Sequence, residues 1–160
     1  MAKILITGMS GTGKSAALRV LKDRGHAVAD TDTDAWSEWV TLPDGSTDWI
    51  WRESAVRDLL TAHAERDGHL FVAGCKSNQG RLYPLFDRVV LLSAPASVIL
   101  ARIAARTDNP YGQRAEERTE ILENLATVEP LIRATASAEI DASASLEEVV
   151  RQLEELADSV

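Results

Sequence analysis

The sequence predicts an α/β fold in which helices flank a doubly wound, mostly parallel sheet of five strands. Short apolar runs alternate with longer amphipathic stretches along all 160 residues, which is typical of repeated strand–helix units. Several runs are continuously apolar, as expected of strands that are covered on both faces. Hydrophobic residues make up 45% of the chain and charged residues 26%, which excludes disordered and collagen-like chains.

The first half of the chain opens with a strand and a helix. The apolar run 3–7 ends at Gly8, and the helix over 15–24 ends at Gly25, a common C-terminal signal. We expect a second helix over 36–40, with Trp36 and Trp39 on one face. The composition of 42–46 predicts a turn. The other expected elements are a strand at 26–30 and a helix from about 49 to 66.

The second half continues the alternation of strands and helices. We expect strands at 69–73 and 88–92, then a helix with Pro95 in its first turn. The polar segment 106–113 predicts a loop, and Pro130 is expected to end or kink the helix over 115–134. A short strand at 139–141 precedes a last helix, whose apolar residues recur at helical spacing. Since no repeat or linker interrupts this pattern, we expect one domain over 1–160.

Charge and cysteine content restrict the partners. The formal net charge of −8 gives no general attraction to nucleic acid or to anionic membranes, so we expect neither as a partner. The single cysteine, Cys75, cannot form an internal disulfide. The apolar run at the N-terminus is too short for a signal peptide or a membrane span. We expect a cytoplasmic monomer or weak dimer that acts on a small molecule.

Residues 8–15 carry the clearest motif, because GMSGTGKS fits the pattern G-x-x-x-x-G-K-[S/T] between a predicted strand and a predicted helix. Glycines let backbone N–H groups turn inward, and the helix N-terminus favours anions. Lys14 brings a positive charge to the β- and γ-phosphates, and the Ser15 hydroxyl can bind Mg²⁺. The alternative is a glycine-rich turn without a ligand. We expect ATP and Mg²⁺ as cofactors, bound by Gly8, Ser10, Gly11, Thr12, Gly13, Lys14, Ser15 and Ala16.

Two aspartates follow the second predicted strand. Strand carboxyl ends face the ligand crevice of an open α/β sheet, so Asp30 and Asp32 are expected to point toward the phosphates. A carboxylate there can hold Mg²⁺, for which we favour Asp32 together with Ser15, or accept the proton of an attacking hydroxyl. The alternative for Asp32 and Asp34 is a helix N-cap. No Asn-Lys-x-Asp stretch occurs, so the guanine-binding signature of GTPases is missing.

With these motifs, the chain resembles the nucleoside-monophosphate-kinase and shikimate-kinase branch of the P-loop proteins over nearly its whole length. The P-loop at 8–15 and the Asp-x-Asp at 30–32 carry the resemblance. It implies that Arg52 binds a substrate carboxylate, that Gly74 lies in a substrate loop and that 140–144 forms an adenine loop. Arg102 and Arg106 resemble lid arginines. The chain departs from shikimate kinases in having one glycine after the third strand, and Ala16 in place of the usual threonine.

The two arginines are four residues apart, so they project from one helical face. A positive clamp stabilises the charge of a moving phosphoryl group, and we expect Arg102 at the phosphates and Arg106 at the adenine. The alternative is a solvated helix face. Segment 107–114 is the expected lid, with Gly112 as hinge; a surface turn without function is the alternative.

On the acceptor side, Asp32, Arg52, Gly74 and Arg81 are the expected substrate contacts. The tryptophans at 36, 39, 49 and 51 are expected to pack mainly in the core. The catalytic set is then Lys14, Asp30, Asp32, Arg102 and Arg106. The sequence therefore predicts an ATP-dependent phosphotransferase with a small-molecule acceptor. The alternative is a nucleotide-binding regulatory or partner-binding protein without kinase activity.

Overall fold

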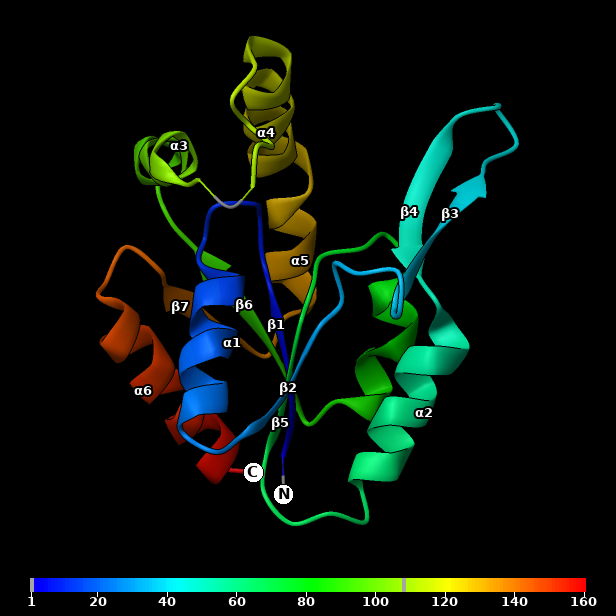
Figure 1. The fold of residues 1–160 in the computed structure, drawn as a ribbon, viewed down its shortest axis with the longest axis vertical. Helices are drawn as coiled ribbons and strands as arrows, with labels where there is room; N and C mark the ends of the chain where they lie inside the picture. Colours follow the sequence, from blue (N-terminus) through cyan, green and yellow to red (C-terminus); the bar gives the residue numbers. More distant parts are fainter. Residues whose placement is uncertain (1, 108) are drawn as a thin grey trace.

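A five-stranded parallel sheet forms the centre of the computed structural model, which describes residues 2–107 and 109–160. The strand order is β2-β5-β1-β6-β7, and every neighbouring pair is parallel. The strands are β2 (Ala27–Asp30), β5 (Leu70–Ala73), β1 (Lys3–Thr7), β6 (Arg88–Ser93) and β7 (Ala138–Asp141). Figure 1 shows this sheet with helices on both sides. The predicted fold class is thus confirmed.

The two faces of the sheet are covered by different helices. Helices α1 (Lys14–Asp23) and α6 (Leu146–Asp158) bury Leu18, Leu21 and Leu153 against one face. Helix α2 (Glu53–His63) and the 3₁₀ helix η1 (Gln79–Leu85) pack on the other face, around Trp51 and Leu82. The central strands are apolar because both of their faces are buried in this way.

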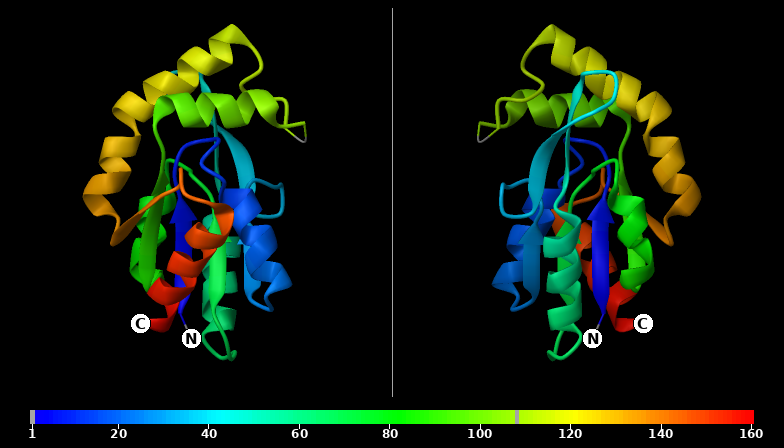
Figure 2. Two further views of the ribbon diagram at one scale, coloured as in Figure 1. Left: turned by 90° about the vertical axis from the view of Figure 1, so that its left-hand side faces the viewer. Right: turned by 90° about the vertical axis from the view of Figure 1, so that its right-hand side faces the viewer.

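Three helices form an arm beyond the carboxyl ends of the strands. They are α3 (Ala96–Ala105), α4 (Ala115–Thr127) and α5 (Glu129–Thr135). Figure 2 shows α3 lying across the end of the sheet and α4 passing above it before α5 turns down beside the sheet. The turn occurs at Val128, just before Pro130, which stands in the first turn of α5. The predicted break at Pro130 is confirmed, because proline removes a helical donor and is accepted at a helix start.

The segment between β2 and α2 differs from the prediction. Residues 36–40 were expected to be helical, but the chain forms a hairpin of β3 (Ser37–Thr41) and β4 (Thr47–Trp51). The helix expected from 49 begins only at Glu53. The Asp44-Gly45 turn was recognised, and alternating Trp, Val, Thr and Ile residues flank it, which together are a hairpin signal. Figure 1 shows the hairpin projecting beside the carboxyl ends of β2 and β5.

No helix in the described part of the chain is both long and apolar enough to cross a membrane.

Candidate functional site

The glycine-rich loop at 8–13 joins β1 to α1 and is shaped by its glycines. Gly8, Gly11 and Gly13 all have positive φ angles. A Cβ on Gly8 would lie 2.4 Å from the Leu92 carbonyl oxygen, whereas one on Gly13 would meet nothing within 4 Å. Gly13 is also the N-cap of α1, and no side chain caps that helix. The N-terminus of α1 therefore faces open space with free N–H donors, which suits an anion.

Lys14 folds back onto this loop. Its Nζ donates hydrogen bonds to the carbonyl oxygens of Gly8 (2.7 Å) and Met9 (3.0 Å). Burial lowers the pKa of Lys14 below its ordinary value, while the nearby charges of Asp32 and Asp30 act in the opposite direction. The ammonium is thus held by two loop carbonyls, and Asp30 and Asp32 are near enough to act on its pKa.

Ser15 and Asp30 are in direct contact, as the ends of α1 and β2 meet here. The Ser15 hydroxyl donates to Asp30 Oδ2 at 2.9 Å, and Asp30 Oδ1 accepts the backbone N–H of Asp32 at 3.1 Å. The alternative in which Asp32 or Asp34 caps a helix containing Trp36 is wrong, because that segment is a strand. The carboxylates are therefore arranged beside the phosphate loop and not at a helix start.

This donor set fits Mg²⁺ but does not form a complete cage. Hydroxyl and carboxylate oxygens are the ligands that Mg²⁺ prefers, and the ion usually keeps waters and binds substrate phosphates as well. Among the described residues, no group of three or more His, Cys, Asp or Glu side chains is placed to hold a metal ion. An ion here would thus need phosphate oxygens besides Ser15 and the aspartates.

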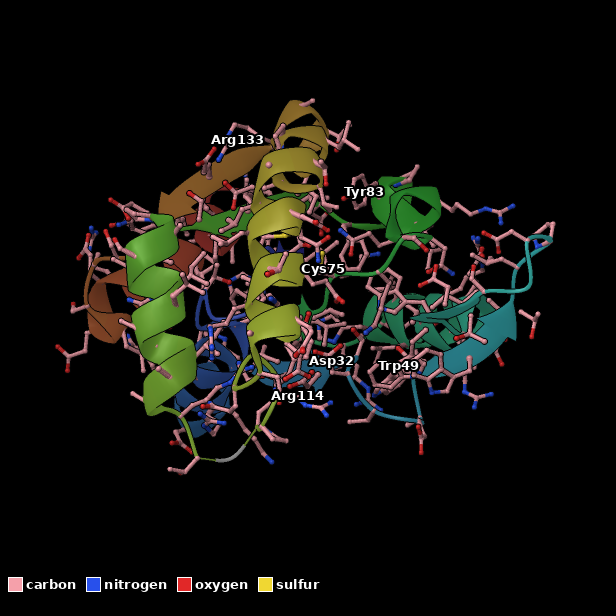
Figure 3. All side chains as sticks on the ribbon, turned by 90° about the horizontal axis from the view of Figure 1, so that it is seen from above. Asp32, Trp49, Cys75, Tyr83, Arg114 and Arg133 are labelled. Carbon is pink, nitrogen blue, oxygen red and sulfur yellow. The ribbon has the colours of Figure 1, made fainter. Side chains whose placement is uncertain are left out.

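Lys76 joins this site, and sequence reasoning missed it. Its Nζ lies 2.6 Å from Asp32 Oδ1 and 4.0 Å from the centre of the Trp49 ring. The lysine comes from the loop after β5, the aspartate follows β2, and the tryptophan belongs to β4. Figure 3, which looks down on this edge, shows Asp32 and Trp49 on the same side of α4. No local motif links the three segments, so the sequence carries no signal for this contact.

The two arginines point to different places, because Arg102 lies in α3 whereas Arg106 follows the last residue of that helix and has an extended backbone. The expectation that both project from one helical face is therefore wrong. An Arg106 nitrogen lies 3.4 Å from Ser10 Oγ in the phosphate loop. The Arg102 guanidinium instead donates to the Ala142 carbonyl at 2.5 Å, in the segment before α6. These contacts place Arg106 at the phosphate loop and Arg102 at the expected adenine loop. The sequence had suggested the opposite assignment, with Arg102 at the phosphates and Arg106 at the adenine.

The expected lid, 107–114, is described except for position 108. Arg106 donates to the carbonyls of Asn109 (3.1 Å) and Tyr111. A Cβ on Gly112 would lie 2.3 Å from Ile103 Cγ2, and Gln113 Nε2 donates to the Ile103 carbonyl at 2.7 Å. This segment therefore packs closely on α3, and Gly112 is needed for that contact.

The residues expected to contact the acceptor differ in their burial and in their partners. Arg52 donates to the Asp34 carbonyl (2.9 Å) and to Glu38 (3.1 Å), which ties the hairpin to the loop after β2. Arg81 is mostly exposed and lies 3.4 Å from Glu53. Gly74 is buried beside Thr31. That these residues bind an acceptor stays a prediction.

The tryptophans divide between core and surface. Trp51 is buried and Trp36 packs against the same cluster. Trp39 is 68% exposed and stacks on Trp49 across the hairpin. The expectation that Trp36 and Trp39 share a helical face is wrong, since they lie on and beside a strand. The side chain of Trp49 therefore contacts both the exposed Trp39 and Lys76.

Solved structures of similar fold include small-molecule kinases. Shikimate kinase from Acinetobacter baumannii, in complex with shikimate, matches with a TM-score of 0.66 and 18% identity, over 99% of this chain and 94% of that chain. A gluconokinase from Sinorhizobium meliloti matches with a TM-score of 0.60 and 19% identity, over 99% and 94% of the two chains. The predicted resemblance to P-loop kinases is confirmed for the fold.

Comparisons of sequence lead to the family. A curated protein of Deinococcus radiodurans, named "Nucleotide-binding protein", is 30% identical over 124 residues, which cover 71% of this chain and 38% of that protein. The chain thus spans well under half of that relative's length. Residues 4–123 match a family described as an AAA domain. Because that match covers most of the chain, including the phosphate loop, the chain belongs to this family of P-loop AAA domains.

Proposed function

We propose that the protein is an ATP-dependent phosphotransferase that moves the γ-phosphoryl group to a hydroxyl or phosphate group of a small molecule. The observation that carries the proposal is the meeting of Lys14, Ser15 and two carboxylates at one edge of the sheet, where Arg106, just after α3, also contacts the phosphate loop. A protein that only held a nucleotide would need the loop. It would gain little from a second carboxylate on the acceptor side.

The phosphate side uses the loop, Lys14 and Arg106. The free N–H groups at the start of α1 bind phosphate oxygens, and Lys14 exchanges its two carbonyl partners for the β- and γ-phosphates. Ser15 and Asp30 hold Mg²⁺, which neutralises phosphate charge when bound. In this assignment Asp30, and not Asp32, is the carboxylate beside Ser15.

The acceptor side uses Asp32. A hydroxyl oxygen of the acceptor attacks the γ-phosphorus, its proton passes to the Asp32 carboxylate, and the bond from phosphorus to the bridging oxygen of ADP breaks. Arg106 stabilises the charge on the moving group, and Arg102, beside Ala142, binds the adenine side. Segment 107–114 closes over the nucleotide and excludes water.

A second candidate is a nucleotide-binding regulatory protein without kinase activity. It is favoured by the name of the relative in Deinococcus radiodurans, which states nucleotide binding only. Both candidates predict ATP binding that depends on Lys14.

Acceptor-dependent release of ADP separates the two. The assay measures ADP from Mg-ATP with sugars, hydroxy acids, nucleosides and nucleoside monophosphates, for the wild type and Asp32→Asn. We expect at least one acceptor to stimulate release, and Asp32→Asn to remove most of the stimulation while ATP still binds. Tight ATP binding without stimulation by any acceptor would favour the regulatory protein.

A further inference from the structure

Lys76 is buried in a way that phosphate binding does not explain. Its side chain is only 8% exposed, and its ammonium lies over the Trp49 ring and against Asp32. An ammonium is strongly hydrated and loses free energy on burial, so buried lysines are uncommon unless they are paired. Asp32, the partner, is 52% exposed. The pair is therefore open to solvent on the aspartate side.

Contacts made by the three residues after Lys76 fix the backbone at this position. Ser77 Oγ donates to Asp48 at 2.6 Å, and the Asn78 amide bonds both the N–H (3.0 Å) and the carbonyl (3.1 Å) of Trp51. These contacts attach the loop to β4.

Gln79 attaches the same loop to the end of β1. Its Oε1 accepts the backbone N–H of Lys76 at 2.9 Å, and its Nε2 donates to Thr7 Oγ1 at 3.0 Å. Thr7 immediately precedes the phosphate loop. The ammonium is thus held at a set place relative to the phosphates, as a recognition group must be.

The ammonium also retains hydrogen-bonding capacity. It has three N–H donors, and among the residues that the structure describes it meets one acceptor atom, Asp32 Oδ1. The two arginines expected to contact the acceptor are engaged differently, since Arg52 is bound by Glu38 and a carbonyl, and Arg81 is mostly exposed. Lys76 is therefore the buried cation nearest the proposed base.

We infer that Lys76 binds an anionic group of the acceptor, so that the acceptor class is a small molecule carrying a carboxylate or a phosphate close to the hydroxyl that is phosphorylated. This inference rests on the proposed function for the acceptor's place beside Asp32. The anion takes hydrogen bonds from Lys76, and the neighbouring hydroxyl then lies against the carboxylate that receives its proton. Uncharged sugars and nucleosides lack the group that Lys76 binds.

The test measures binding of charged and uncharged probes by calorimetry, with saturating Mg-ADP to fill the phosphate loop. Carboxylate probes are D-gluconate and L-malate, against D-gluconamide and malamide. Phosphate probes are glycerol 3-phosphate and glucose 6-phosphate, against glycerol and glucose. The proteins are the wild type, Lys76→Met, Lys76→Arg and Lys22→Met, which removes the same charge from the exposed side of α1. Thermal unfolding checks that each variant is folded.

We expect one charged class to bind the wild type at least about tenfold more tightly than its uncharged partner, since a charge-assisted hydrogen bond has that effect. The preference should fall to about twofold or less in Lys76→Met, persist in part in Lys76→Arg, and be unchanged in Lys22→Met. The class that binds identifies the anion as a carboxylate or a phosphate.

Three outcomes would overturn the inference: equal binding of charged and uncharged probes by the wild type, a preference that survives in Lys76→Met, or one lost equally in Lys22→Met. If Lys76→Met does not fold, folded Lys76→Arg decides: a preference for the charged probe that is reduced in Lys76→Arg supports the site, and one kept at full strength there opposes it. Binding is measured without turnover. If the charged probes bind through Lys76 but no acceptor stimulates ADP release, the anion site is supported. In that case the result contradicts only the proposed phosphotransferase function.

Discussion

The phosphate loop and the loop after β5 meet at the same edge of the sheet, but different contacts hold them. Within the phosphate loop, Thr12 Oγ1 bonds the Met9 carbonyl three residues away, and Lys14 bonds Gly8 six residues away. In the loop after β5, Asn78 bonds Trp51 at a separation of 27 residues and Gln79 bonds Thr7 at a separation of 72. The phosphate loop is thus held by local contacts, whereas the loop after β5 takes its place only after the chain has folded.

Mutations in the two loops should therefore have different effects on activity and on stability. Side chains of the phosphate loop such as Lys14 are aimed at a ligand, so their loss should reduce activity much more than stability. Residues of the loop after β5, such as Gly74 and Asn78, hold segments of the fold together. Their loss should therefore reduce stability more than activity. The variants below test that division, beginning with the largest expected effect.

Lys14→Met should have the largest effect on function. The variant removes the charge that meets the β- and γ-phosphates but keeps most of the side-chain volume. We expect acceptor-dependent ADP release to fall by about a hundredfold or more, with weaker ATP binding by calorimetry and an unchanged circular dichroism spectrum. Lys22→Met is the matched control and should behave as wild type. Wild-type turnover in folded Lys14→Met would contradict the assignment of the phosphate site.

Arg102, in α3, and Arg106, just after it, should have two different roles. Arg106→Ala removes the side chain that reaches Ser10 and should lower kcat by about a hundredfold. Arg102→Ala removes a contact to Ala142 and should act mainly on the KM for ATP, by about tenfold. Steady-state kinetics against ATP measure both, with the exposed Arg57→Ala as control. A larger loss of kcat in Arg102→Ala would restore the order that the sequence predicted.

Gly74→Ala should destabilise the acceptor side. The new Cβ would lie 2.0 Å from Thr31 Oγ1 and 3.3 Å from Trp51 Nε1. Overpacking of this kind costs about 1–3 kcal/mol, which urea unfolding would detect. Gly80→Ala is the control, because a Cβ there meets nothing within 4 Å and the residue lies in η1. Equal stability of the two variants would mean that the loop moves aside freely.

Asn78→Ala should have a smaller effect of the same kind. It leaves the N–H and carbonyl of Trp51 without the amide that bonds both, and lost hydrogen bonds to partly buried groups cost about 1–2 kcal/mol. Unfolding in urea measures the loss, with Asn124→Ala on α4 as the matched substitution. An unchanged midpoint in Asn78→Ala would show that the loop is held mainly by its neighbours.

The same division explains what the sequence could predict. The phosphate motif, the strand before it and the helix after it lie within about twenty residues, and all were found. Lys76 was missed because its partners, Trp49 and Asp32, are distant in sequence. The hairpin was missed for another reason: the spacing of Trp36 and Trp39 was read as helical, although strand-forming residues on both sides of Asp44-Gly45 indicated a hairpin.

For Asp30 and Asp32, the sequence predicted the position but not the partners. Their position at the carboxyl end of β2 was predicted from the rule that strand carboxyl ends face the ligand crevice. Their separate partners, Ser15 for Asp30 and Lys76 for Asp32, depend on how three segments pack. Sequence alone therefore located the pair but did not distinguish its members.

The smallest expected effect is on the stability of the nucleotide-free protein and concerns the pH dependence of Lys14. Burial lowers the pKa of Lys14 in the folded chain. Between that lowered pKa and the unfolded value near 10.5, the unfolded chain binds more protons, so stability from this group rises with pH. We expect the free energy of unfolding of the wild type to rise relative to Lys14→Met as pH approaches 10.5 from below. Urea unfolding at several pH values from 7 to 10 measures the difference. A difference that stays constant or falls would show that burying the Lys14 ammonium does not reduce the free energy of unfolding. The proposed contrast, in which Lys14 serves ligand binding at the expense of stability while the loop after β5 serves stability, would then be contradicted.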